Sequence, residues 1–330
     1  MMTTTPGKLN GLTRAANSSG VFTIFAIDHR DAMRAVLDPG DPDGVSDGVL
    51  TAMKLEFAGA MGSEASAVLL DPEYSAFEAV RTNVLPRDTS FLVALEGQGY
   101  VGDPSCRVTG ILDGWSVEKA KLMGAAGVKL LLLYRPDSAA AEVQEELVAT
   151  VVRECERWDI PLFLEPVGYP LGARYGQEPS RRWIVCESVR RLGALGPDIL
   201  KVQFPADTTT VDRPEWEDAC AELDEASPVP WALLSGGDPF RSFLSQVEIA
   251  CAAGSSGFLV GRALWGEPAR METDDRTAAI HKDVIPRFRE LASVASALGT
   301  SWTSRAGGNP PSVGFASYGV ASEGPANTGS

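Results

Sequence analysis

The sequence contains little histidine and has no excess of positive charge, and each shortage argues against a class of function. Its 330 residues include two histidines, His29 and His281, a number that does not suit a histidine-rich zinc centre. The formal net charge of −15 argues against a broad nucleic-acid-binding surface. Attraction to an anionic substrate must therefore come from a few local lysine and arginine side chains.

Long hydrophobic runs and paired cysteines are missing as well. No apolar stretch approaches the roughly 20 residues that span a bilayer. The N-terminal MMTTTPGKLNG also lacks the apolar core of a signal peptide. The cysteines form no CxxC pair and are interpreted as reduced thiols: Cys106, Cys155, Cys186, Cys220 and Cys251. We therefore expect a cytoplasmic protein that has no membrane segment and binds no metal, cofactor or nucleic acid.

What the sequence does contain is a regular alternation of apolar runs and helix-like stretches. Eight apolar runs predict strands at 21–27, 66–70, 90–95, 127–134, 160–165, 198–204, 230–235 and 256–260. Helical patterns lie between or after them, for example at 116–127, 139–158, 178–196, 238–254 and 275–298. Eight βα units predict an α/β protein with a single-domain (β/α)8 TIM barrel. A doubly wound open sheet is the alternative, but no G-x-G-x-x-G follows the first strand.

The same pattern suggests how the chain is divided. The barrel is expected over residues 19–300, after an N-terminal extension at 1–18. Residues 301–330 form a C-terminal tail that is rich in Gly, Ser, Pro and Asn from Gly307 onward. Such a composition is typical of a flexible segment, because it offers little apolar surface to bury.

Polar residues stand at the C-terminal end of every predicted strand, which is the end where barrel enzymes have their active sites. Each is an ordinary turn residue when taken alone, but together they predict a charged site: Asp28, Asp71, Glu96, Arg135, Glu165, Gln203, Ser235 and Arg262. His29, in the motif IDHRD, could belong to this site or have a structural hydrogen-bonding role.

Two lysines interrupt apolar strands. Side chains alternate along a strand, so Lys201 shares a face with Gln203, and Lys129 shares one with Leu131. An outward lysine would press into the layer of apolar helices, so both are expected to point into the barrel. A neutral lysine amine is a nucleophile for a carbonyl carbon. Lys201 could serve that purpose or form a structural ion pair, and Glu165 could be a general acid/base or a counter-ion.

Glycines follow the last two strands. The segments LLSGGDPF and LVGRALW place Gly236, Gly237 and Gly261 where barrels often bind phosphate through backbone N–H groups. Arg262 would add a charged donor. The glycines could also serve only to form tight corners, but their position after strands seven and eight favours a phosphate site.

With these residues in view, the chain resembles the class I tagatose-1,6-bisphosphate aldolases, within the wider group of DeoC/LacD-like Schiff-base aldolase barrels. The resemblance extends from about residue 20 to 270 and rests on AIDHRDAM, VLLDPEY, ALEGQGY, GVKLLLLYRPDS, IPLFLEPV, DILKVQFP, LLSGG and GFLVGRALW. It implies cleavage of a ketose phosphate into dihydroxyacetone phosphate and glyceraldehyde 3-phosphate, without a cofactor, by a homo-oligomer.

The resemblance also implies residue roles. Lys201 would be the Schiff-base lysine and Glu165 the acid/base carboxylate, with Lys129 and Asp28 flanking the ketone and hydroxyls. The phosphate of dihydroxyacetone phosphate would lie against Ser235, Gly236, Gly261 and Arg262. Arg30 and Arg135 are candidates for the distal anion of the substrate.

Some positions depart from that family. Gln203 stands where the family commonly has glutamate, two residues after the lysine. The segments RDAM, LEPV, YRPDS and SGFLVGRA are closer to the sulfofructose-phosphate aldolases, whose second product would be sulfolactaldehyde. Two other hypotheses remain: a barrel that binds a phosphosugar without turning it over, and an isomerase that forms no covalent intermediate.

Overall fold

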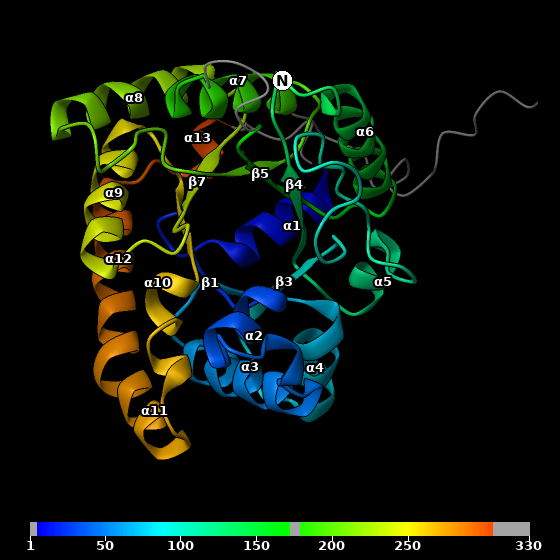
Figure 1. The fold of residues 1–330 in the computed structure, drawn as a ribbon, viewed down its shortest axis with the longest axis vertical. Helices are drawn as coiled ribbons and strands as arrows, with labels where there is room; N and C mark the ends of the chain where they lie inside the picture. The colour runs from blue at the N-terminus through cyan, green and yellow to red at the C-terminus, as the bar shows by residue number, and fades with distance from the viewer. Residues whose placement is uncertain (1–4, 172–178, 306–330) are drawn as a thin grey trace, which may run out of the picture.

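In the computed structural model, eight parallel strands close into a barrel in chain order, with helices around them (Figure 1). The structure describes residues 5–171 and 179–305. The strands are β1 (Phe22–Ala26), β2 (Ala67–Leu70), β3 (Ser90–Ala94), β4 (Gly127–Leu133), β5 (Leu162–Val167), β6 (Ile199–Val202), β7 (Trp231–Leu234) and β8 (Gly257–Val260). The predicted (β/α)8 barrel is confirmed. Every strand lies within its predicted run except β5, which continues through Pro166.

Helices connect successive strands and cover the outside of the barrel. They are α1 (Pro6–Ala15), α2 (Asp31–Leu37), α3 (Asp47–Met61), α4 (Phe77–Thr82), α5 (Val117–Leu122), α6 (Ala141–Arg157), α7 (Arg181–Gly193), α8 (Arg213–Ala226), α9 (Phe240–Ala253), α10 (Arg262–Trp265), α11 (Thr273–Ala279), α12 (Ile285–Leu298) and α13 (Trp302–Arg305). Side-chain N-caps fix several helix starts: Ser46 accepts from the N–H of Val49, and Ser116 from that of Lys119.

The longest predicted helix contains a local irregularity. The stretch predicted at 275–298 is built from α11 and α12 with a π-helical turn, Ile280–Val284, between them. His281 lies on this turn and is exposed. The predicted helix at 178–196 begins at Arg181, and residue 178 lies outside the described residues.

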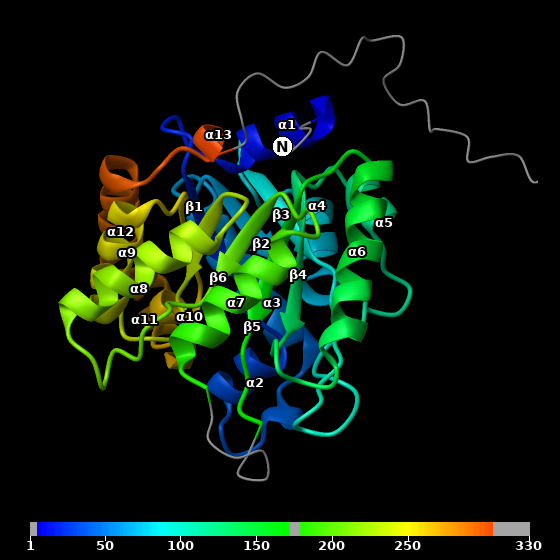
Figure 2. The same ribbon diagram turned by 90° about the horizontal axis from the view of Figure 1, so that it is seen from above.

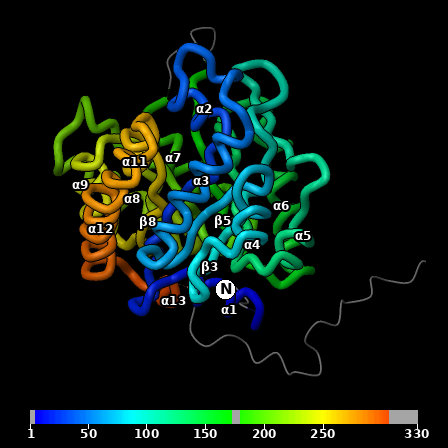
Figure 3. The backbone as a smooth tube through the Cα atoms, turned by 90° about the horizontal axis from the view of Figure 1, so that it is seen from below, coloured from blue at the N-terminus to red at the C-terminus, as the bar shows by residue number. Residues whose placement is uncertain are grey.

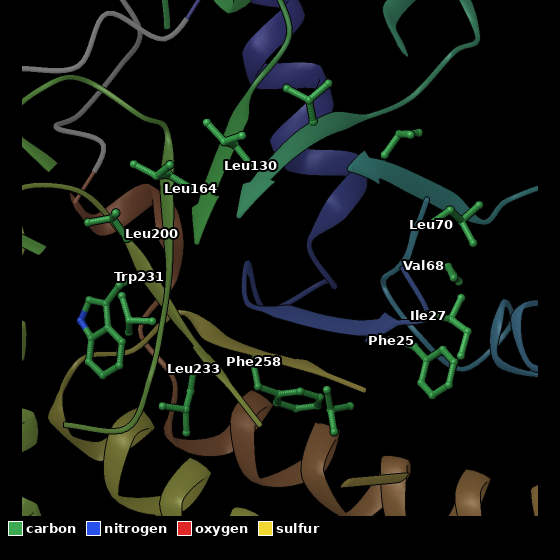
Figure 4. Packing of buried hydrophobic residues seen from close by; sticks show 14 of the residues in the cluster. Phe25, Ile27, Val68, Leu70, Leu130, Leu164, Leu200, Trp231, Leu233 and Phe258 are labelled. Atoms are coloured by element: carbon green, nitrogen blue, oxygen red, sulfur yellow. The ribbon is translucent and has the colours of Figure 1, made fainter. Parts of the chain in front are cut away.

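Alternate strand residues form the apolar core between barrel and helices. Figure 4 shows these side chains pointing away from the barrel interior, and all of them are buried. They include Phe25, Val68, Leu130, Leu164, Leu200, Leu233 and Phe258. The intervening residues of the same strands must therefore point inward.

Apolar inward residues of the strands form a second cluster, here called the apolar layer, which extends from the N-terminal end of the barrel as far as Ala26, the last residue of β1. It comprises Phe22, Ile24, Ala26, Ala67, Leu69, Leu92, Phe163, Ile199, Ala232 and Leu259, together with Leu12, Ala15, Ala126 and Trp302. Leu12 belongs to α1 and Trp302 to α13, so these two helices close this end of the barrel. Figures 2 and 3 show both helices at the same end, away from α2.

The predicted domain boundaries remain predictions. Residues 6–15 of the predicted extension form α1, and residues 302–305 of the predicted tail form α13. Residues 1–4 of the predicted extension and 306–330 of the predicted tail lie outside the described residues.

Candidate active site

A cavity of about 350 Å³ opens at the C-terminal ends of the strands. Most of the site residues predicted from the sequence line it: Asp28, Arg30, Glu96, Lys129, Glu165, Lys201, Gln203, Ser235, Gly236, Gly261 and Arg262. The exceptions are Asp71 and Arg135. The cavity therefore brings together residues from strands that are far apart in the sequence, at the end of the barrel where such enzymes have their active sites.

Strand alternation explains why both lysines reach this cavity. On β6, Ile199 points into the apolar layer, and Lys201, two residues later, points into the cavity. On β5, Phe163 and Glu165 have the same relation. The predicted inward orientation of Lys129 and Lys201 is confirmed, and both side chains are almost fully buried.

Lys129 lies at the centre of three carboxylates. Its Nζ is 2.8 Å from Asp28 Oδ2, 2.6 Å from Glu96 Oε1 and 3.0 Å from Glu165 Oε2. Burial by itself would lower the pKa of Lys129, but the charges of Asp28, Glu165 and Glu96 outweigh it and raise that pKa well above the usual value. Lys129 is therefore a permanent cation and does not suit the role of nucleophile.

Lys201 has a different environment. Its Nζ is 2.9 Å from Glu165 Oε1, and Glu165 is the one acidic residue within ion-pair distance of it in the described part of the chain. Burial would raise the pKa of Glu165, but the charges of Lys129 and Lys201 lower it below its usual value. One ionised carboxylate is thus shared by two buried amines, and Lys201 receives a smaller share of negative charge than Lys129.

The two remaining carboxylates complete what we call the charged cluster: Lys129, Lys201, Asp28, Glu96 and Glu165. Burial would raise the pKa of Asp28, but the charges of Lys129 and Lys201 hold it far below its usual value. Glu96 also accepts a hydrogen bond from the backbone N–H of Leu131 at 2.9 Å through its second oxygen. The sequence pattern predicts Glu96 as a polar strand end, but no local pattern predicts its contact with Lys129.

The opposite side of the cavity is suited to an anion. Gly236 and Gly237 follow β7 with φ values of 59° and 95°, a conformation that favours glycine. The N–H of Gly261 lies 3.4 Å from Ser235 Oγ, and Arg262 donates from Nη2 to the carbonyl of Gly236 at 2.9 Å. These contacts join the loops after β7 and β8 and place an exposed guanidinium at their junction.

The residues predicted to bind the distal anion are already engaged. Arg30 lines the cavity, but it contacts Glu73 at 2.5 Å and donates to the carbonyl of Glu96 at 2.6 Å. Arg135 does not line the cavity. It is buried and donates to both carboxylate oxygens of Asp137 at 2.9 Å each. Its position after β4 suggested a site residue, but an acid two residues further along binds its side chain.

Two other strand-end residues have mainly structural contacts. Gln203 accepts a hydrogen bond from the backbone N–H of Gly168 at 2.9 Å and so ties the end of β6 to that of β5. Asp71 lies away from the cavity and is fully buried, with Lys54 Nζ at 2.5 Å from its carboxylate.

No group of His, Cys, Asp or Glu side chains in residues 5–171 and 179–305 has the arrangement of a metal site. Within the same ranges, no helix is long and apolar enough to span a membrane.

This combination of barrel, buried lysines and shared carboxylate can be compared with known proteins. Residues 22–267 match the profile of the DeoC/LacD family aldolases. The chain therefore belongs to this family, whose members are carbon–carbon lyases, and the family resemblance predicted from the sequence is confirmed.

Individual relatives agree with this assignment. The chain is 29% identical to a tagatose 1,6-diphosphate aldolase of Streptococcus agalactiae serotype V, over 91% of this chain and 99% of the relative. It is 28% identical to the tagatose 1,6-diphosphate aldolase of Lactococcus lactis subsp. lactis, over 80% and 86%. The fold is similar to that of a Schiff-base-forming fructose-1,6-bisphosphate aldolase, with a TM-score of 0.59 and 23% identity over 86% of this chain and 98% of the other.

Proposed function

We propose that the protein is a class I, metal-independent aldolase in which Lys201 forms a Schiff base with a ketose phosphate. The observation that supports this most directly is the asymmetry of the two buried lysines. Lys129 contacts three carboxylates, whereas Lys201 contacts one that it shares. The proposal also agrees with the activities for which the relatives and the structural neighbour described above are named.

The first step is attack on the ketone. Glu165 Oε1, 2.9 Å from Lys201 Nζ, is placed to take the proton that makes the amine a nucleophile. The amine adds to C2 of the substrate to form a carbinolamine. Glu165 returns its proton to the C2 hydroxyl, which leaves as water, so that an iminium ion forms and Glu165 is again a carboxylate. Lys129, always charged, stabilises the negative charge that develops on the C2 oxygen during the addition.

The second step is cleavage. Glu165 removes the proton of the C4 hydroxyl, the C3–C4 bond breaks, and its electron pair moves into the iminium to form an enamine. The aldehyde product leaves. Protonation of the enamine carbon and hydrolysis of the iminium then release dihydroxyacetone phosphate and regenerate Lys201. A lysine that stayed protonated could not start this sequence, which is why a single shared carboxylate favours Lys201 over Lys129.

The phosphate of this half of the substrate would lie against Ser235, Gly236, Gly261 and Arg262. The glycines allow the backbone N–H groups to approach an anion, and Arg262 supplies a positive charge.

We propose tagatose 1,6-bisphosphate as the substrate, which yields glyceraldehyde 3-phosphate as the aldehyde. The alternative is 6-deoxy-6-sulfofructose 1-phosphate, which yields sulfolactaldehyde. It is supported by the sequence segments closest to the sulfosugar enzymes. It is also compatible with the structure, because Arg30 and Arg135 both bind internal acids and neither provides a free phosphate-binding side chain.

Borohydride reduction in the presence of dihydroxyacetone phosphate tests the proposal. We expect an intact-mass increase of one reduced adduct, which peptide mapping assigns to Lys201. Lys201→Met should remove both the adduct and aldolase turnover, whereas the exposed Lys282→Met should retain both. Turnover should also survive treatment with a chelator.

An adduct on another lysine, or turnover by Lys201→Met, would overturn the catalytic assignment. Melting-temperature shifts with sugar phosphates but without an adduct would favour the binding barrel, and isomerisation without an adduct would favour the isomerase. Once the adduct is established, cleavage assays with the two candidate ketoses distinguish phosphate from sulfonate at the distal end.

A further inference from the structure

His29 lies in the cavity but has no part in the mechanism above. Its ring stands edge-on to Trp265, with ring centroids 5.2 Å apart. Trp265 is itself fixed by a hydrogen bond of 3.1 Å from Nε1 to the carbonyl of Ala26. On the other side, a Cβ added to Gly261 would come within 2.8 Å of His29 Cε1. The imidazole is therefore held beside the loop that is proposed to bind phosphate.

The two ring nitrogens have different surroundings. Nδ1 is buried and lies 3.6 Å from Asp28 Oδ1, and neither atom has a hydrogen-bond partner in the described part of the chain. An ionised carboxylate can only accept hydrogen bonds, so the tautomer with hydrogen on Nδ1 is favoured. Nε2 is then left with a free lone pair. Because a quarter of the side chain is exposed and the ring lines the cavity, this nitrogen is available to a ligand.

The charge state of the ring agrees with this orientation. Burial lowers the pKa of His29, and although Asp28 raises it, the charges of Lys201, Arg262 and Lys129 lower it further, to about 4. These groups come from β6, α10 and β4, so cationic neighbours lie on several sides. At neutral pH the imidazole is uncharged, and Nε2 remains a hydrogen-bond acceptor.

We infer that His29 Nε2 accepts a hydrogen bond from the free hydroxyl of the dihydroxyacetone-phosphate half of the substrate, and so selects a hydroxylated ketone. The inference rests on the proposed function, which places the ketone carbon at Lys201 and the phosphate at Gly261 and Arg262. In dihydroxyacetone phosphate, the ketone carbon bears the phosphate arm on one side and the hydroxymethyl group on the other.

A methyl ketone that lacks this hydroxyl shows how much the hydrogen bond to His29 should contribute to binding. Hydroxyacetone phosphate has the same ketone and phosphate, but a methyl group replaces the hydroxymethyl group. It cannot donate to Nε2 and would leave a desolvated acceptor without a partner, a loss that corresponds to roughly tenfold weaker binding.

Nuclear magnetic resonance of protein labelled with ¹⁵N-histidine tests the inference directly, because the chain has only two histidines to observe. His281→Gln removes the second signal, and His281 is exposed. We expect unliganded His29 to carry its hydrogen on Nδ1. Dihydroxyacetone phosphate should shift the Nε2 resonance, and hydroxyacetone phosphate should not. Hydrogen on Nε2, equal shifts with both probes, or no shift with either would overturn the inference.

Borohydride trapping provides the second readout. The wild-type protein should reach half-maximal adduct at a concentration of dihydroxyacetone phosphate about tenfold below that of hydroxyacetone phosphate. His29→Phe should abolish this preference, and His29→Gln, whose amide oxygen can accept, should keep part of it. Adducts on Lys201 without any preference would refute the role of His29 and leave the Schiff-base proposal intact. A shift of Nε2 specific to dihydroxyacetone phosphate, with no adduct, would do the reverse.

Discussion

The interior of the barrel has an apolar half and a charged half, although the same strands build both. In the apolar layer, Phe163 and Ile199 pack under α1 and are fully buried. Two residues further along the same strands, Glu165 and Lys201 belong to the charged cluster. Two residues of strand correspond to roughly 6.6 Å, so a hydrocarbon interior gives way to five ionisable groups over little more than one side-chain width.

The difference shows how a barrel can hold charges that would be costly elsewhere. Removing charges from water is expensive unless each is paired, and every member of the cluster has an oppositely charged neighbour within 3.0 Å. The apolar layer contains no polar group to compete for them, and its packing fixes the strands that position them. The apolar layer therefore contributes to stability alone, whereas the charged cluster contributes to both stability and the proposed chemistry, and substitutions in each should have different consequences.

The largest effect on stability is expected from Lys129→Met. This change leaves Asp28, Glu96 and Glu165 buried together without their shared cation. Breaking a buried ion pair in this way typically costs about 3–5 kcal/mol. For a chain of 330 residues, that corresponds to a fall in melting temperature of about 4–7 °C. Calorimetry or chemical denaturation would measure the loss.

Lys201→Met is the matched control within the charged cluster. It removes one ammonium group, but Glu165 keeps its 3.0 Å contact with Lys129. We expect it to abolish turnover with a much smaller loss of stability. Equal destabilisation by both substitutions would show that the two lysines are not divided into a structural and a reactive one.

The next effect is expected from Leu69→Ala in the apolar layer. Leu69 is fully buried and does not line the cavity. Truncation of a buried leucine removes packing and leaves a void, at a cost of about 3–4 kcal/mol. Because the charged cluster is untouched, the turnover number should change by less than about threefold in assays well below the melting temperature. A large loss of turnover without a loss of stability would contradict the division between the halves. Val143→Ala, at an exposed position of α6, controls for removal of apolar atoms alone.

Sequence reasoning succeeded where local patterns determine the outcome. The apolar runs located the strands, and alternation placed Lys129 and Lys201 inside the barrel, because an outward lysine has no water to reach. The contacts between side chains could not be predicted in the same way. Glu96 meets Lys129 because β3 and β4 are neighbours in the sheet, where Ala94 pairs with Lys129. That contact depends on barrel closure and register.

Arg135 and α1 show what local patterns miss. Arg135 follows its strand in the same way as the true cavity residues, but Asp137 and the carbonyl of Tyr169 bind its guanidinium away from the cavity. The residues of α1 belong to the predicted extension, and no pattern in that segment predicts that Leu12 packs in the apolar layer. In both cases the position of a residue is decided by a partner that is brought near only when the whole barrel forms.

The smallest and most gradual effect concerns the pH dependence of stability, through His29 at the edge of the charged cluster. Burial and nearby cations lower its pKa from 6.5 to about 4. Between these values the unfolded chain binds a proton that the folded chain does not, so stability should fall as pH decreases from about 6.5 to 4. The loss would reach at most about 3 kcal/mol. Asp28 and Glu165 have lowered pKa values, so their contributions to stability decline at more acidic pH and can be separated from that of His29.

Denaturation midpoints should be measured across the range from pH 6.5 to 4. Their dependence on pH should become flatter in His29→Phe and stay unchanged in His281→Gln. A slope that persists in His29→Phe would show that His29 is already protonated in the folded protein and cannot serve as a neutral acceptor.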